Sequence, residues 1–325
     1  MNVAILGAGL IVPDFLEAIS LVDELTPYAI MGVEKDLERM QEFKAQYNIE
    51  KIYHYIDDVL ADEFVEVVYV ALPNFLHYEF SKKALEAKKN VICEKPFTSN
   101  LKEAQELIRV AKENGVHIFE AITNQYLPSY KKTKELLPTL GDLKIVELNY
   151  SQYSRRYDAF KEGQILPVFD PNKSGGALYD LNVYNVHFIV GLFGRPTGVH
   201  YYPNIEKGID TSGILVLEYP TFKAVLIGAK DCKAPVCINL QGDQGYIHSD
   251  IPANVYDVFK AGLNLGEEKE YNLNEGKPRL YYEMVAFVEA MKNPVLFDQY
   301  DQHSLEVMEV LTNARNDAGI KFKGE

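Results

Sequence analysis

Short apolar runs alternate with segments of helical periodicity through residues 1–121, and no other pattern in the sequence limits the fold as strongly. Val3–Leu6 is the first run, and apolar residues then recur at helical spacing from Ile11 to Val22. The later runs are Tyr28–Val33, Val65–Ala71, Val91–Cys93 and Val116–Glu120. Strands that alternate with helices form a right-handed, doubly wound parallel sheet. We therefore predict an α/β fold with an N-terminal domain over residues 1–121.

A glycine turn joins the first predicted strand to the first helix. Gly7 allows the tight turn, and Gly9 lets the backbone approach a pyrophosphate at the helix N-terminus. Val12 stands where such turns usually carry a third glycine or alanine. We predict that Gly7, Gly9, Leu10 and Ile11 bind a dinucleotide.

Glu34 closes the second predicted strand. An acid at this place accepts hydrogen bonds from the adenosine ribose and repels a 2′-phosphate, so it favours NAD. Lys35 beside it would pair with that phosphate instead, and NADP is therefore the alternative cofactor. The alternative is that Glu34 and Lys35 are only solvated charged residues at a strand end.

A loop follows the run Val65–Ala71, at the carboxyl edge where parallel sheets bind their ligands. We predict that Leu72, Pro73 and Asn74 in this loop contact the cofactor. His77 begins the next helix, a position where histidine is more often structural than catalytic. We expect His77 to brace the loop beneath the cofactor.

Glu94-Lys95-Pro96 follows the run Val91–Cys93 and places an acid, a base and a ring at the same edge. Pro96 keeps Lys95 out of helical backbone angles and fixes the direction in which the chain leaves the sheet. A lysine held there places its ammonium beside a reacting oxygen. A solvated Glu–Lys pair is the alternative, but the neighbouring motifs favour Glu94 and Lys95 as cofactor contacts and Lys95 as a catalytic residue.

From Asp142 the apolar residues alternate, which is typical of strands with one buried face. We predict strands at 146–150, 212–217, 224–229, 237–241, 246–249 and 255–259, and helices at 280–291 and 304–318. Residues 122–325 are thus expected to form an α+β domain with a large, open, mostly antiparallel sheet. The outer face of that sheet is either solvated or paired with a second subunit.

The most informative segment of the second half is a helix predicted after Ser174-Gly175-Gly176. Asp180, Tyr184 and His187 are spaced to form one polar stripe on a helix that is otherwise apolar. Such a helix is buried with its polar stripe toward a cavity. The alternative is a hydrogen-bonded network that only holds helices together.

Gly7-Ala8-Gly9, Pro73-Asn74 with His77, and Glu94-Lys95-Pro96 occur together and in this order. Over nearly its whole length the chain resembles the glucose-fructose oxidoreductase / inositol dehydrogenase (Gfo/Idh/MocA) family of NAD(P)-dependent oxidoreductases. The segment Asp180-x-Asn182-x-Tyr184 resembles the tyrosine form of a family motif, as in dihydrodiol dehydrogenases, with Asn182 in place of glycine. Gln125 stands where many members carry arginine.

This resemblance implies hydride transfer between a nicotinamide and a secondary alcohol or carbonyl of a sugar, polyol or cyclic diol. Tyr184 would take the hydroxyl proton, and Lys95 would stabilise the phenolate, since an ordinary phenol has a pKa of about 10. Asp180 would orient Tyr184. The implied substrate contacts are Arg156, Asn182 and His187, although Arg156 alone would be read as a surface arginine. The cofactor supplies the chemistry, so no metal is expected.

Composition restricts the partners. A formal net charge of −14 argues against nucleic acid or an anionic membrane, and no apolar run reaches the ~18 residues of a membrane span. The three cysteines lack metal-ligand spacing and are expected to be reduced thiols of a cytoplasmic protein. We expect a small-molecule substrate and, from the resemblance, a homodimer or homotetramer formed through the C-terminal sheet.

Two other functions fit the same fold. A non-catalytic NAD(P)-binding regulator would not need the Lys95 and Tyr184 pair. A reductase of a non-sugar ligand, such as a cyclic imine or a linear tetrapyrrole, would need a more apolar pocket than Asp180, His187 and Arg156 provide.

Overall fold

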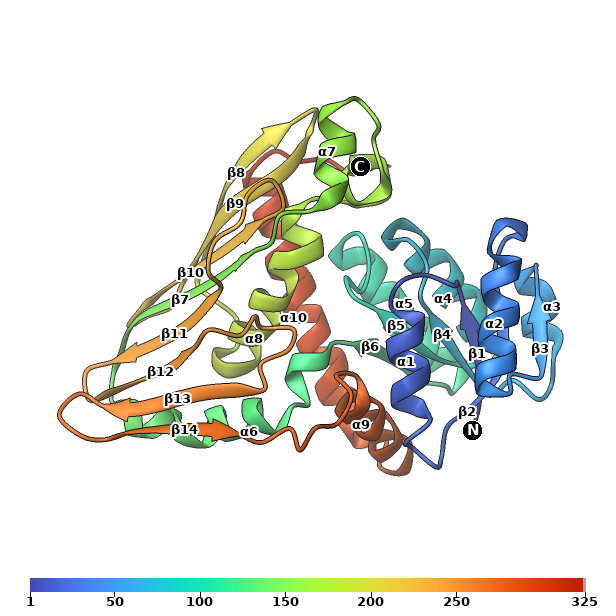
Figure 1. The fold of residues 1–325 in the computed structure, drawn as a ribbon, viewed down its shortest axis with the longest axis horizontal. Coiled ribbons are helices and arrows are strands. Elements are labelled where there is room, and N and C mark those ends of the chain that lie inside the picture. The colour runs from blue at the N-terminus through green and yellow to red at the C-terminus, as the bar shows by residue number, and fades with distance from the viewer. Residues whose placement is uncertain (324–325) are drawn as a thin grey trace. The chain divides into compact units, whose positions relative to one another are not determined.

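The computed structural model describes residues 1–323, and the chain divides into two compact units. Unit 1 comprises Met1–Ala121 and Lys277–Leu305, and unit 2 comprises Ile122–Gly276 and the residues from Glu306 onward. Each unit contains its own sheet (Figure 1). The chain first changes unit after Ala121, where the sequence placed the domain boundary, but Lys277–Leu305 belongs to unit 1 and not to the predicted second domain.

Unit 1 is built on a six-stranded sheet in the order β3-β2-β1-β4-β5-β6, and every neighbouring pair is parallel. The strands are β1 (Asn2–Leu6), β2 (Thr26–Met31), β3 (Lys51–Tyr53), β4 (Val67–Val70), β5 (Asn90–Glu94) and β6 (Ile118–Ala121). The strand order reverses between β1 and β4, and ligands of such sheets bind at the carboxyl ends near this point. The predicted doubly wound sheet is confirmed; β3 was missed because its three half-buried residues show no apolar run.

Helices flank this sheet (Figure 1). They are α1 (Val12–Ile19), α2 (Leu37–Tyr47), α3 (Ile56–Ala61), α4 (His77–Glu86), α5 (Leu101–Asn114) and, from the returning segment, α9 (Tyr281–Lys292). The sequence defines α5 sharply, because Asn100 Oδ1 accepts a hydrogen bond from the Glu103 amide at 3.1 Å and Gly115 ends the helix at φ 69°.

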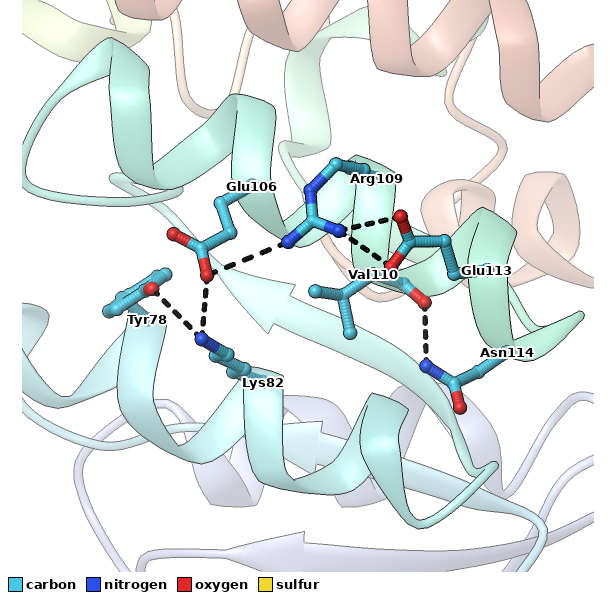
Figure 2. A network of polar contacts seen from close by, with 7 residues as sticks. All are labelled: Tyr78, Lys82, Glu106, Arg109, Val110, Glu113 and Asn114. Atoms are coloured by element: carbon cyan, nitrogen blue, oxygen red, sulfur yellow. Dashed lines mark hydrogen bonds and ion pairs between the residues drawn. The ribbon is translucent and has the colours of Figure 1, made fainter.

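A surface network joins α4 to α5 (Figure 2). Lys82 Nζ lies 2.6 Å from Glu106 Oε1, and Arg109 makes an ion pair of 2.6 Å with Glu113 one turn along α5. The Lys82 ammonium lowers the pKa of Glu106. Pairs as exposed as these stabilise little. Of these two pairs, Lys82–Glu106 crosses from α4 to α5, whereas Arg109–Glu113 lies within α5.

Unit 2 is built on an eight-stranded sheet in the order β14-β13-β12-β11-β7-β10-β9-β8. The strands are β7 (Leu143–Ser151), β8 (Gly198–Glu206), β9 (Ile209–Glu218), β10 (Lys223–Ala229), β11 (Cys237–Gly242), β12 (Gly245–Ser249), β13 (Val258–Leu263) and β14 (Glu268–Asn272). Only β7 and β10 pair in parallel among these strands. The predicted open, mostly antiparallel sheet is confirmed, although β8 and β14 were missed and β13 begins later than expected.

The helices of unit 2 include α6 (Pro128–Leu136), α7 (Arg155–Lys161) and α8 (Val183–Phe193). A 23-residue helix, α10 (Val295–Asp317), begins in unit 1 and ends in unit 2. Its start is nine residues earlier than the predicted Ser304. Helix α8 packs on the face of the sheet formed by β7 and β10, and it carries Tyr184.

Candidate active site

The turn between β1 and α1 has the geometry of a phosphate-binding loop. Gly7 adopts φ +105°, and a Cβ at this position would lie 2.5 Å from the carbonyl oxygen of Ala71. Its amide donates to the Met31 carbonyl at 2.8 Å, so the turn is fixed against both β2 and β4. Only glycine fits here.

The residues after Gly7 expose backbone at the N-terminus of α1. Gly9 is exposed, and Leu10 retains 73% of its surface. Ile11 is the N-cap and forms no side-chain cap hydrogen bond, so its side chain satisfies none of the first amides of α1. These features fit the pyrophosphate of a dinucleotide, which would take its hydrogen bonds from these amides.

Glu34 lies at the carboxyl end of β2, in the short turn Glu34–Asp36. Its side chain is 82% exposed, and its Oε2 lies 4.0 Å from His54 Nδ1. The carboxylate is therefore open to the hydroxyls of a ribose. Lys35, on the same turn, is also exposed.

His77, the first residue of α4, joins two loops of the cofactor edge. Its Nδ1 lies 2.8 Å from the Pro96 carbonyl oxygen, and its Nε2 lies 2.8 Å from the Leu72 carbonyl oxygen. The ring is buried, and burial lowers the pKa of His77. The ring thus holds the loop that contains Pro73 and Asn74 against the residues that follow Lys95, which is the bracing expected from the sequence.

Glu94 and Lys95 lie at the carboxyl end of β5. Glu94 is buried, and its Oε1 accepts a hydrogen bond from the Tyr69 hydroxyl at 2.6 Å. Burial raises the pKa of Glu94, against the opposing effects of that hydrogen bond and of the positive charges of Lys95 and Arg279. Lys95 itself is partly exposed at the edge of the sheet.

Tyr69 and Arg279 were not anticipated. Tyr69 lies inside an apolar run, where a hydroxyl gives no distinct signal. Arg279 Nη2 lies 3.0 Å from Asp14 Oδ2 in the first turn of α1, a contact between residues 265 positions apart. No local pattern predicts such a pairing.

In unit 2, the segment predicted as one α-helix begins with a π-helical turn, Leu178–Asn182, and continues as α8. Asp210 Oδ2, from β9, accepts a hydrogen bond from the Leu178 amide at 2.7 Å and another from the Tyr201 hydroxyl at 2.8 Å. Burial raises the pKa of Asp210 to about 6. Gly176 adopts φ +106°, and a Cβ there would overlap Asp210 Oδ1. The Gly-Gly turn therefore lets Asp210 reach the start of the helix.

Asp180 and Tyr184 lie on this helix. The Asp180 carboxylate pairs with the ammonium of Lys230, a buried residue at the end of β10, and keeps 30% of its surface. Tyr184 is 8% exposed, and its ring lies 6.2 Å from the ring of Tyr150. Tyr150 also lines a cavity of about 670 Å³ with Gln152, Tyr153, Lys233 and Asp250.

The remaining candidates have structural partners. Asn182 is fully buried: its amide donates to the Leu226 carbonyl at 3.1 Å and its oxygen accepts from Asn185 at 2.9 Å, so it serves the packing of the helix on β10 and not the expected substrate contact. His187 is also fully buried. Gln125 donates to the His187 carbonyl at 2.8 Å, which fixes α8 from the first turn of unit 2.

Arg156 lies on α7, and its side chain is exposed, as a surface arginine would be. Unit 1 thus brings together the glycine turn, Glu94, Lys95 and His77, and unit 2 brings together Asp180, Tyr184 and Lys230. Within residues 1–323, no cluster of three or more His, Cys, Asp or Glu side chains has the arrangement of a metal site. Over the same residues, no helix is long and apolar enough to cross a membrane.

The parallel sheet, its glycine turn and the open α1 N-terminus define a Rossmann-type dinucleotide-binding domain. Residues 1–122 match the family model described as "Oxidoreductase family, NAD-binding Rossmann fold", and residues 130–248 match the "GFO/IDH/MocA C-terminal domain". The chain belongs to the Gfo/Idh/MocA family, and the resemblance predicted from the sequence is confirmed.

Two curated relatives extend this result. The scyllo-inositol 2-dehydrogenase (NADP(+)) IolU of Bacillus subtilis is 32% identical over 329 residues, which span 99% of this chain and 98% of IolU. The trans-1,2-dihydrobenzene-1,2-diol dehydrogenase of Mus musculus is 32% identical over 66% of this chain and 64% of its own length. The protein is therefore an NAD(P)-dependent dehydrogenase or reductase.

Among solved structures, the 3-ketoreductase KijD10 of Actinomadura kijaniata in complex with NADP and TDP-benzene has a TM-score of 0.82. It shares 20% sequence identity and covers 99% of this chain and 98% of its own. At this identity the likeness concerns the fold alone.

Proposed function

We propose that this enzyme oxidises a secondary hydroxyl of a cyclic polyol or diol and, in the reverse direction, reduces the corresponding ketone. The observation that carries the proposal is the placement of a partly exposed carboxylate, Asp180, four residues before a phenol, Tyr184, on one helical segment of unit 2. A hydroxyl-rich ligand matches these groups. The names of the two curated relatives, an inositol dehydrogenase and a dihydrodiol dehydrogenase, support the same class.

In the proposed reaction the bound nicotinamide supplies the hydride chemistry. Tyr184, as phenolate, takes the proton of the substrate hydroxyl, and the ammonium of Lys95 stabilises that phenolate and the negative charge that develops on the substrate oxygen. Asp180 orients the substrate by accepting hydrogen bonds from its hydroxyls. His187 supports the substrate side of the helix, and exposed Arg156 is assigned to the entrance of the site.

We propose NAD as the preferred cofactor. The exposed carboxylate of Glu34 suits the two free hydroxyls of the NAD ribose, whereas it would repel a 2′-phosphate. Lys35 offers that phosphate one partner, and the relative IolU uses NADP according to its name. Glu34→Ala should therefore shift the ratio of kcat/KM values toward NADP.

The outer face of the unit 2 sheet is the proposed contact between subunits of a homodimer or homotetramer. Exposed apolar side chains stand on it, including Ile145, Tyr202 and Ile214. Exposed apolar side chains on one face of a sheet are compatible with a subunit interface. We also assign the protein to the cytoplasm, in accord with its three free thiols, Cys93, Cys232 and Cys237.

The function is tested with a panel of substrates, and turnover is measured as the change in absorbance of the reduced nicotinamide. Inositols, cyclic dihydrodiols, aldoses and linear polyols are each supplied with NAD and with NADP. We expect turnover with at least one cyclic polyol or diol. An enzyme that binds NADH but turns over none of these compounds, in either direction, would contradict the proposal and favour the regulator.

A further inference from the structure

Lys230 is a buried lysine of unit 2 whose backbone is held from two sides. It follows β10 directly and keeps only 4% of its surface. Its amide donates to the Thr211 carbonyl at 2.9 Å, and its carbonyl accepts from the Ser154 amide at 2.9 Å. The backbone of Lys230, from which the side chain extends, is therefore fixed by β9 and by the segment after β7.

The ammonium of Lys230 has specific partners. It forms an ion pair with Asp180 Oδ2, and it lies 5.6 Å from the centre of the buried Phe169 ring. A buried ammonium is costly unless a carboxylate compensates its charge. Asp180 supplies that compensation, and the aromatic face adds a weaker attraction.

The pair is asymmetric in its exposure. The Lys230 side chain is 5% exposed, whereas that of Asp180 is 30% exposed. The ammonium of Lys230 therefore acts on a ligand only indirectly, through the carboxylate of Asp180. On its own side, Asp180 belongs to the π-helical turn, and its amide donates to the Gly176 carbonyl at 3.1 Å. Both ends of the ion pair thus start from a fixed backbone.

We propose that Lys230 is a positioning residue of the substrate site, which holds Asp180 as an anion in one orientation. In this state Asp180 accepts hydrogen bonds from substrate hydroxyls, and it does not take the proton that leaves the substrate. That proton goes to Tyr184 alone. The inference rests on the proposed function for its substrate, but the ion pair itself does not depend on the substrate.

The first experiment compares Lys230→Met with a matched control, Lys207→Met. Lys207 also lies over a buried ring, with its Nζ 4.7 Å from the centre of Phe160, but within residues 1–323 it bonds to backbone carbonyls and to no carboxylate. We expect Lys230→Met to lower kcat/KM for the polyol about 10- to 100-fold while the Kd of NADH is unchanged. Lys207→Met should retain the wild-type kcat/KM, and Lys230→Arg should recover most of the activity.

The second experiment combines Lys230→Met with Asp180→Asn. Because both changes act through one carboxylate, the double variant should lose no more kcat/KM than Asp180→Asn alone. It also replaces a buried charge pair by neutral groups, so it remains measurable if Lys230→Met alone does not fold. Full additivity of the two losses, or wild-type kcat/KM in folded Lys230→Met, would overturn the proposal.

A crystal structure of unliganded Lys230→Met separates this inference from the proposed function. We expect the Asp180 carboxylate to leave its wild-type position, even if no polyol is ever turned over. An unmoved carboxylate in that variant would reject the positioning role, whatever the substrate panel shows.

Discussion

At the scale of single residues, two glycines of one turn are required for different reasons. A methyl group on Gly7 would meet the Ala71 carbonyl and force a positive φ on alanine, whereas a Cβ on Gly9 would lie 3.9 Å from the same oxygen. We expect Gly7→Ala to lower the free energy of unfolding by about 1–3 kcal/mol. Gly9→Ala should keep its stability and weaken NADH binding, because in the proposed binding mode the backbone at Gly9 approaches the pyrophosphate.

Urea unfolding and a fluorescence titration with NADH measure the two effects. The opposite assignment, with an unstable Gly9→Ala and a stable Gly7→Ala, would show that the turn is not built as described.

Asp62 is a structural centre of unit 1. Its carboxylate accepts hydrogen bonds from Lys51 at 2.8 Å, from Tyr53 at 2.8 Å and from Tyr28 at 3.1 Å. Although burial opposes it, this set of donors, with the Phe64 amide, lowers the pKa of Asp62. A lowered pKa stabilises the fold above the pKa of the unfolded chain, about 4, and the stabilisation is lost as the pH falls further.

The prediction is that Asp62→Asn reduces stability at pH 7 and that this deficit shrinks below about pH 4, where the Asp62 carboxyl of the unfolded wild-type chain takes up its proton while the folded one stays ionised. Unfolding by urea at a series of pH values measures the difference. A deficit that stays constant from pH 7 to pH 3 would mean that the charge of Asp62 is not what stabilises this site.

Some residues of the candidate site could be predicted from the sequence because of their residue type and position. Gly7, Lys95 and Tyr184 have distinctive chemistry at distinctive places in the pattern. Lys230 follows an apolar strand in the way that any surface lysine does, and only the folded sheet brings it to Asp180. The partners of Asn182, which are Leu226 and Asn185, likewise come from packing and could not be predicted from the local sequence.

At the scale of elements, the π-helical turn before α8 depends on Gly176. This glycine combines φ +106° with an overlap between its hypothetical Cβ and Asp210, whereas Gly163 has φ +97° and no atom within 4 Å of its hypothetical Cβ. Gly163→Ala therefore measures backbone strain alone, about 1 kcal/mol. Gly176→Ala should cost more and should also lower activity, because it displaces the cap of the helix that carries Asp180.

Thermal unfolding and kcat/KM of the two variants provide the comparison. If both variants lost the same stability and kept their activity, the contact of Asp210 with the start of the helix would not determine the position of Asp180.

Elements with a clear period were predicted well, and those without one were not. The buried strands β1, β4 and β5 are short apolar runs, and β7 alternates cleanly. In contrast, β8 and β14 lie at the two edges of their sheet and are largely exposed, so hydrophobic periodicity gives no signal there.

At the scale of the whole molecule, the outer face of the unit 2 sheet separates into two parts. Tyr202, Ile214 and Ile227 form one cross-strand row of apolar side chains on β8, β9 and β10. Asn149 continues the row on β7, where polar groups begin. An apolar area next to a polar one matches the core and rim of a subunit interface.

We expect Ile214→Glu to dissociate the proposed dimer without unfolding the chain, because the side chain is already 44% exposed in the single chain. Leu265→Glu, at a fully exposed loop position, is the control and should leave the assembly intact. Sedimentation velocity of both variants gives the mass. An unchanged mass for Ile214→Glu would place the contact elsewhere.

The division of the chain was only partly visible in the sequence. The change of period after residue 121 marks the start of unit 2, but the return of Lys277–Leu305 to unit 1 follows from packing. His117 stacks on Phe297 with ring centres 4.2 Å apart, and Phe119 meets Phe287 at 5.6 Å. Such contacts join residues far apart in the chain, which local patterns do not report.

The proposed mechanism assigns Lys95 and Tyr184 to one hydride transfer. Its most direct test is deuterium transfer from the best substrate of the panel, labelled at the reacting carbon, to the oxidised cofactor, followed by mass spectrometry. The wild-type enzyme should deliver the deuterium to the nicotinamide, and Lys95→Ala and Tyr184→Phe should each slow this transfer at least about 100-fold while still binding NADH. Transfer at the wild-type rate by Tyr184→Phe would show that Tyr184 does not take the proton of the substrate.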